Sequence, residues 1–270
     1  MSITAFMDSL WSDYTSITPQ ADRIYQAFTE RGETVVNDHV AFRTLALEPI
    51  GLAKLEPHLL ALGYTPFEPY EFPAKKLRAY GYLPPEATQP RVFLSELLVE
   101  ELSPKSADIL KKLASQVAAD AAADPSVMWR GPLWDPIAYD DYQQLVSESE
   151  YAAWFSTLGL RANHFTISVN HLNSCEEVED VLQVVESLGY AINDSGGRVK
   201  GSPDRFLEQA STMADKQVIE FAGGEQHEVP TCYYEFAKRY MTPEGGLFQG
   251  FVAASADKIF ESTDVRENKA

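Results

Sequence analysis

The sequence predicts an α+β protein in which two copies of a βαβββ unit form one curved mixed sheet around a metal cleft, with added helices. Three observations support this prediction. Strand-like and helix-like patterns recur in the same order twice along the 270 residues. Both copies begin with a strand that has a histidine on its polar face. The landmarks that follow each histidine are spaced alike.

The first unit is expected over residues 33–100. In the strand pattern of 37–47, His39 and Arg43 share one face because side chains alternate along a strand. An amphipathic helix follows over 52–62, with leucines at three- and four-residue spacing. Pro-rich turns then separate three further strands, which we expect over 64–70, 76–83 and 91–99.

The second unit and the C-terminal segment are expected over residues 161–262. A strand over 162–169 places His164 on its polar face, and a helix extends from Ser174 to a glycine at 189. After a polar, glycine-containing stretch, a short strand is predicted over 217–222. The opening strand, the helix and the closing strand of the first unit thus recur in the second.

The spacing of landmarks extends the repeat to a glutamate. His39 and His164 each precede a Leu-Gly-Tyr glycine, by 24 and 25 residues respectively. They precede Glu96 and Glu220 by 57 and 56 residues. If the polar strand faces of both units point into one cleft, the two imidazoles and at least one of these carboxylates should converge.

The remaining segments are expected to complete a single domain over 1–270. Helical periodicity predicts two helices within residues 2–31. The connection between the two units, 101–160, should contain an alanine-rich helix over 103–123. Its aromatic-rich second part, 124–160, is expected to be irregular.

Composition excludes several classes of partner. The formal net charge of −18 would repel nucleic acid and anionic membrane surfaces. No apolar run approaches the ~18 residues of a membrane-spanning helix, and the N-terminus lacks the basic region of a secretory signal. The two cysteines, Cys175 and Cys232, form no ligand-like cluster and fit a reducing compartment. We therefore expect a cytoplasmic protein.

Two histidines and one carboxylate form the ligand set of non-heme Fe(II) oxygenases, although Zn, Ni or Mn would also accept it. His39, His164 and Glu220 are the candidate ligands, and His171 or His227 would be the replacement if one histidine is wrong. A structural zinc site would need four ligands and more cysteine. Thus the pattern indicates an open metal site that leaves room for a substrate.

Arg43 is a candidate anchor for an acidic substrate. Its guanidinium can bind a carboxylate through two parallel hydrogen bonds. A substrate that chelates a metal at one end and has a second acid group at the other would fit the spacing between His39 and Arg43. The alternative is an ion pair with one of the 40 acidic residues of this chain.

Several segments together resemble a known family, the 2-oxoadipate dioxygenase/decarboxylase family of the vicinal-oxygen-chelate superfamily. The resemblance covers about residues 20 to 262, most of the chain. It is strongest in five segments, His39-Val40-Ala41-Phe42-Arg43, Asn163-His164-Phe165-Thr166, Val218-Ile219-Glu220-Phe221, Tyr234-Glu235-Phe236 and Phe248-Gln249-Gly250-Phe251-Val252.

The resemblance implies a half-barrel with mononuclear Fe(II) bound by His39, His164 and Glu220. It further implies conversion of 2-oxoadipate and O2 to 2-hydroxyglutarate and CO2. The substrate-binding residues would be Arg43, Gln249 and Val252. The small-molecule 2-oxo acid and O2 are then the expected partners.

Glu96 departs from a three-ligand arrangement. Its position in the repeat would make it a fourth ligand, as in glyoxalase-like relatives, or a hydrogen-bonded partner that orients a ligand, which we favour. Two other functions use the same residues differently. One is a glyoxalase-like isomerase, lyase or hydrolase with Zn, Ni or Mn, and the other is a non-catalytic module that only binds a small molecule.

Overall fold

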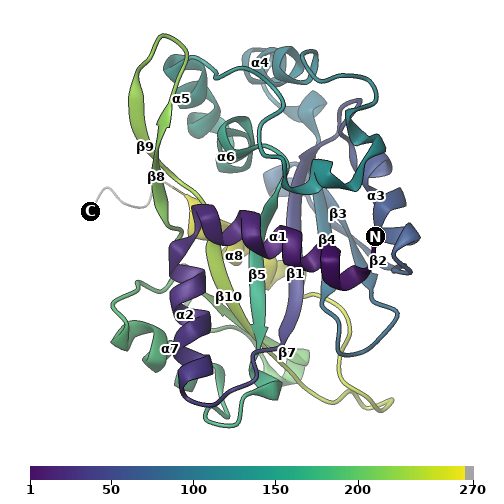
Figure 1. The fold of residues 1–270 in the computed structure, drawn as a ribbon, viewed down its shortest axis with the longest axis vertical. Coiled ribbons are helices and arrows are strands. Elements are labelled where there is room, and N and C mark those ends of the chain that lie inside the picture. The colour runs from purple at the N-terminus through teal and green to yellow at the C-terminus, as the bar shows by residue number, and fades with distance from the viewer. Residues whose placement is uncertain (265–270) are drawn as a thin grey trace.

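The computed structural model describes residues 1–264, in which eight strands form one mixed sheet and two more form a separate hairpin (Figure 1). The strand order is β2-β3-β4-β1-β5-β10-β7-β6. Helix α8 contacts both edge strands, β2 and β6, so the sheet curves around it. The predicted α+β fold is confirmed; residues 265–270 of the predicted domain lie outside the described residues.

The first unit has the predicted order of one strand, one helix and three strands. Its first and last strands are parallel neighbours in the sheet, and His39 is paired with Arg91. The elements are β1 (Asn37–Leu45), α3 (Leu52–Ala61), β2 (Thr65–Phe72), β3 (Leu77–Leu83) and β4 (Arg91–Leu97).

The second unit repeats this order, but a hairpin interrupts it. The strand that corresponds to β4 is β10, because β10 pairs in parallel with β5 and places Tyr233 opposite His164. The predicted last strand, 217–222, instead lies in the hairpin of β8 (Lys216–Glu220) and β9 (Gln226–Pro230). The repeat itself consists of β5 (Ala162–Ser168), α7 (Val178–Ser187), β6 (Lys200–Ser202), β7 (Leu207–Ser211) and β10 (Tyr233–Arg239).

The helices differ from the predicted ones in the connection between the units. The alanine-rich helix ends at Ala114, where the chain turns and Val117 packs into the core. The segment expected to be irregular contains two helices, and Ser149 caps the second by accepting a hydrogen bond from the Ala152 N–H. The helices not yet given are α1 (Ile3–Ile17), α2 (Pro19–Glu30), α4 (Pro104–Ala114), α5 (Tyr139–Glu148), α6 (Glu150–Leu158) and α8 (Ala253–Ile259).

Alternation along the central strands separates the apolar core from the polar face of the sheet. Phe165 of β5 and Tyr234 of β10 point toward α1, where the Trp11 ring lies 5.1 Å and 5.8 Å from their rings. Their neighbours His164 and Glu235 therefore point to the opposite face, which α8 covers. Among the described residues, no helix is long and apolar enough to cross a membrane.

Glu33 joins the segment before β1 to the segment before α7. Its carboxylate accepts hydrogen bonds from the backbone N–H groups of Asn173 and Ser174. Hydrogen bonds from Ser174 and Asn173 lower the pKa of Glu33 to about 2. Because the folded-state pKa lies below the unfolded value, the stability that this carboxylate contributes is present above about pH 4.5 and is lost as the pH falls toward 2.

We therefore expect Glu33→Gln to lower the free energy of unfolding near neutral pH, with a smaller loss in acid. Urea unfolding of both proteins at about pH 6 and about pH 3 measures the difference. A deficit of equal size at both pH values would contradict the assigned ionisation of Glu33.

Candidate metal centre

Three buried side chains from neighbouring strands converge on the polar face of the sheet. They are His39 of β1, His164 of β5 and Glu235 of β10, and one potential ligand atom from each lies within 4.8 Å of the others. The ladder places them together, because Thr166 of β5 pairs with both His39 and Glu235. The fold thus brings residues from both units to one point.

The two imidazoles present the same nitrogen to the carboxylate. His164 Nε2 lies 3.1 Å from Glu235 Oε2, and His39 Nε2 lies 3.5 Å from Glu235 Oε1. The rings are nearly perpendicular, with centroids 5.5 Å apart. This arrangement turns both Nε2 atoms toward one carboxylate, with Thr166 Oγ1 3.0 Å from His39 Nε2 and Gln209 donating to Glu235 Oε1.

Hydrogen bonds on the far side of each ring fix the orientation of the ligands. His39 Nδ1 lies 2.8 Å from Asp38 Oδ1, and His164 Nδ1 lies 3.0 Å from Asn163 Oδ1. With protons on the Nδ1 atoms, the Nε2 lone pairs face the carboxylate of Glu235. Partners of this kind are typical of metal-binding histidines.

The protonation states also suit a metal. Burial lowers the pKa of His164, although Glu235 opposes this shift, so the neutral imidazole is favoured. Burial alone would raise the pKa of Glu235, but His39 and His164 lower it below its usual value. Glu235 Oε2 is buried and accepts no hydrogen bond among the described residues. A cation between the two Nε2 lone pairs and this oxygen would stabilise the arrangement, so the residues fit a metal cofactor.

Asp38 links the candidate ligand His39 to a buried arginine. Arg239 donates to both carboxylate oxygens of Asp38, over 2.7 Å and 2.9 Å. Burial would raise the pKa of Asp38, but Arg239 and His39 hold it well below its usual range. The carboxylate therefore stays ionised and orients the His39 ring.

We expect Asp38→Asn to weaken metal binding by about 10- to 100-fold, the effect typical of an outer-shell partner. Titration of metal-free protein with Fe(II) or Co(II) measures the affinity. Asp13→Asn is a matched control, because Asp13 also pairs with an arginine, Arg161, but contacts no candidate ligand. Equal effects of the two substitutions would contradict an orienting role of Asp38.

The cavity beside the three ligands is small and mostly apolar. It leaves about 20 Å³ accessible to water, and its wall includes Phe93, Phe251 and three residues of the C-terminal segment, Ala256, Ile259 and Phe260. Phe93 pairs with Ala41 of β1, three residues before Glu96. In the second unit, the corresponding residue of β10 is Glu235, which pairs with Thr166 of β5. A phenyl ring thus stands where a fourth, symmetrical ligand would be.

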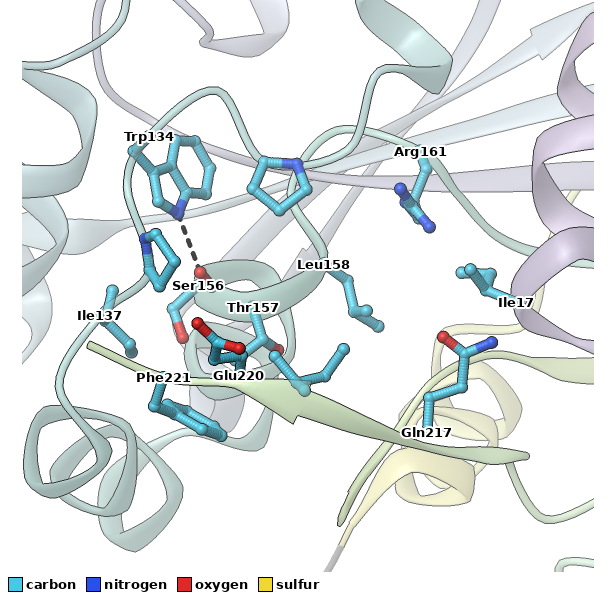
Figure 2. A pocket seen from close by; sticks show the side chains of 13 residues that line it. Ile17, Trp134, Ile137, Ser156, Thr157, Leu158, Arg161, Gln217, Glu220 and Phe221 are labelled. Carbon is cyan, nitrogen blue, oxygen red and sulfur yellow. Dashed lines mark hydrogen bonds between the residues drawn. The ribbon is translucent and has the colours of Figure 1, made fainter. Parts of the chain in front are cut away.

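The prediction that Glu220 is the third ligand is wrong. Glu220 is exposed at the end of β8, and Figure 2 shows it in a different pocket, near Ser156 and Thr157. That pocket has a volume of about 320 Å³ and also contains Trp134 and Arg161. The count along the sequence failed because the β8–β9 hairpin lies between the third strand of the repeat and its last strand, β10.

Glu96 is neither a metal ligand nor a partner of one. It lies on the face of β4 opposite to Phe93, since the two positions are three residues apart. Its carboxylate accepts hydrogen bonds from the Leu52 N–H at the start of α3 and from Arg78 on β3. The structure therefore assigns Glu96 to the packing of the first unit.

Arg43 is buried beyond the cluster and pairs with a carboxylate of the protein. Its Nη1 lies 3.0 Å from Glu150 Oε2, and its Nη2 donates to Thr263 Oγ1. The rings of Tyr151 and Trp154 lie about 5 Å from the guanidinium. Its Nε has no hydrogen-bond partner among the described residues. The ion pair considered from the sequence is present, and a role in substrate binding stays a prediction.

The other two predicted substrate-binding residues lie outside the wall of the metal cavity. Gln249 accepts a hydrogen bond from Arg91, and Val252 occupies the N-cap position of α8. Phe251, between them, contacts His39, with ring centroids 4.9 Å apart. Neither replacement histidine joins the cluster, since His171 bonds Ser168 Oγ and His227 stacks on Tyr139 in the β8–β9 region.

The ligand missed from the sequence is Glu235. Its segment, Tyr233 to Arg239, has one carboxylate among three aromatic residues and an alanine, before two basic residues, and forms a central, largely buried strand. A lone glutamate in such a strand needs a partner, because an isolated buried charge is costly. That argument would have favoured Glu235 over Glu220, which lies in an alternating, half-exposed strand.

Comparisons with known proteins agree with this geometry. Residues 6–248 match the family described as 2-oxoadipate dioxygenase/decarboxylase. The rice protein named 2-oxoadipate dioxygenase/decarboxylase, chloroplastic/amyloplastic, is 37% identical over 279 residues, 93% of this chain and 75% of that protein.

Two solved structures are similar over nearly the whole chain. The rice hydroxyglutarate synthase in complex with 2-oxoadipate has a TM-score of 0.91 and 34% identity, covering 98% of this chain and 93% of that one. A Shewanella frigidimarina protein, provisionally named a hydrolase, has a TM-score of 0.88 and 44% identity, with coverage of 93% and 98%.

Proposed function

Because the chain belongs to the 2-oxoadipate dioxygenase/decarboxylase family, we propose that it is an Fe(II)-dependent oxygenase that decarboxylates and hydroxylates a 2-oxo dicarboxylic acid of the 2-oxoadipate type. The observation that supports this most is the buried set of His39, His164 and Glu235, which leaves one side open to a cavity. Two histidines and one carboxylate with open positions are typical of oxygen-activating Fe(II) sites.

Bound iron would supply chelation of the 2-oxo acid and activation of O2. The residues of the chain do the rest. Asp38 and Asn163 hold the Nδ1 protons, so both Nε2 atoms keep a lone pair, although Thr166 Oγ1 lies 3.0 Å from that of His39. Gln209 donates to Glu235 Oε1 and fixes the carboxylate. The rings of Phe93 and Phe251 exclude water from the reacting centre.

Arg43 would determine the preference for a diacid. It lies on the same strand as His39 and on the same face, four residues further along. A second carboxylate of the substrate would compete with Glu150 for this guanidinium. The cavity of about 20 Å³ is too small for a six-carbon acid, so Ala256, Ile259 and Phe260 must shift when the acid binds.

Oxygen uptake by the Fe(II)-loaded protein tests this function. We expect uptake with 2-oxoadipate and weaker activity with 2-oxohexanoate, which lacks the second carboxylate. Arg43→Met should reduce kcat/KM for the diacid by about 10-fold or more, the worth of a charged hydrogen bond, and should affect the monoacid less. Absence of uptake with every 2-oxo diacid tried would refute the substrate class, and absence of bound metal would refute the site.

The second candidate is a metal-dependent hydrolase, isomerase or lyase on the same scaffold. The provisional name of the Shewanella frigidimarina protein favours it, and the same ligands accept Zn, Ni or Mn. Elemental analysis of protein purified without added metal separates the two, since stoichiometric iron supports the oxygenase. A cytoplasmic location also stays a prediction, which cell fractionation tests.

A further inference from the structure

A second cavity lies at the start of β1, on the other side of Asp38 from the metal centre. Its volume is about 230 Å³, and it shares no lining residue with the cavity of the three ligands. The beginning of β1, the β3–β4 connection, the segment after β5 and the end of β10 all contribute to its wall. The polar and charged residues of its wall include Asn37, Asp38, Gln89, Arg91, His171 and Arg239.

The charges in this wall are unbalanced. Arg91 and Arg239 are its two guanidinium groups, and Asp38 is the only carboxylate among the described residues that line it. Arg239 occupies both oxygens of Asp38 and also donates to the carbonyl groups of Phe248 and Gly250. The charge of Asp38 is therefore largely committed to Arg239 and to His39.

Arg91 has little compensation of its own. Its Nη1 lies 3.5 Å from Asp38 Oδ2 and 3.4 Å from the Asp38 carbonyl oxygen, both long contacts, and its Nη2 donates to the neutral Gln249 amide. Its Nε is buried without a hydrogen-bond partner, and so is Asn37 Oδ1. Burial and the charge of Arg239 lower the pKa of Arg91 to about 10. In a chain of net charge −18, a largely enclosed guanidinium that shares its carboxylate with a second arginine is unusual, and a bound anion would compensate its charge.

We propose that this cavity binds a small oxyanion, either a carboxylate or a tetrahedral oxyanion, through the guanidinium of Arg91. The planar fork of an arginine matches two oxygens of such an anion. The amide of Gln89 and the exposed imidazole of His171 line the same wall and offer further polar contacts. The inference stands independently of the proposed oxygenase activity, because it uses neither the metal nor the 2-oxo acid.

Calorimetric titration of the metal-free, full-length protein tests this site. The probes are sodium sulfate and glutarate, a diacid without the 2-oxo group that chelates a metal, with chloride at matched ionic strength as the reference. We expect saturable binding of at least one probe at low salt, weakened about 10-fold or more by Arg91→Gln, which removes a charged hydrogen bond. Arg205→Gln, at an exposed arginine, makes the same change of charge and should leave the affinity unchanged.

The outcomes are separable. Sulfate binding alone identifies a tetrahedral oxyanion site, glutarate binding alone identifies a carboxylate site, and either supports the proposal if Arg91→Gln weakens it. Crystals soaked in selenate should show an anomalous peak beside Arg91, which separates this cavity from Arg43. Arg91→Lys keeps the positive charge but not the planar pair of N–H donors, and should bind the anion with intermediate affinity if the folded state is intact. Absence of binding of both probes, or equal affinity in the wild type and Arg91→Gln, would overturn the proposal.

Discussion

Glu235→Gln is expected to abolish stoichiometric metal binding and to lower both metal affinity and oxygenase activity by more than ~100-fold, beyond the ~10- to 100-fold typical of an outer-shell partner. The reason is the position of its carboxylate, 3.1 Å and 3.5 Å from the two histidine Nε2 atoms. Glutamine keeps the shape of the side chain but not the charge that a divalent cation requires. Elemental analysis and titration with Fe(II) measure the loss.

Glu220→Gln is the matched control for this experiment. It removes the same charge from an exposed carboxylate in the pocket of Figure 2. Metal content and activity should stay at the wild-type level. Loss of metal in Glu220→Gln, with metal retained in Glu235→Gln, would reverse the assignment of the third ligand.

Glu150→Gln is expected to destabilise the fold by about 3–5 kcal/mol, the cost of removing one partner of a buried ion pair. Arg43 and Glu150 are both buried, and Nη1 lies 3.0 Å from Oε2. Thr263 completes the cluster by donating to the same carboxylate oxygen. Without the charge of Glu150, the buried guanidinium of Arg43 keeps only neutral partners among the described residues. Urea unfolding measures the change.

Two further variants test whether the lost stability comes from leaving one buried charge without its partner. Glu48→Gln breaks an exposed ion pair with Lys54 and should cost only about 0–1 kcal/mol. The double variant Arg43→Met, Glu150→Met leaves no unpaired charge and should lose less than Glu150→Gln alone. A cost of Glu150→Gln no larger than that of Glu48→Gln would show that the pair is not part of the stable core.

The first unit could be predicted almost completely from the sequence, whereas the end of the second could not. In residues 37–97 the periodicity of apolar residues and the Pro and Gly turns identify each strand and helix in order. In the second unit the same signals marked β8 as the last strand, because its alternating pattern is typical of a strand and it is one. Which strand joins the sheet depends on long-range pairing that periodicity does not encode.

The residues of the candidate site likewise fall into those predicted from the sequence and those that only the structure shows. His39 and His164 were identified because each begins a recurring strand and lies on its polar face, a local property. Glu235 was not, since its role depends on the parallel pairing of β10 with β5. The sequence also suggested Arg43 as a charged anchor, but only the structure shows that Glu150 pairs with it from the start of α6.

The sequence by itself therefore determined the class of the fold, the repeated unit, the two histidines of the candidate site and the resemblance to a family. The tertiary structure decided the third member of the candidate site, the position of Phe93 in place of a fourth, and the partner of Arg43. The physical reason is the distance along the chain over which each kind of interaction acts. Alternation and helical spacing act over a few residues, whereas a metal site forms where strands far apart in the chain pair side by side.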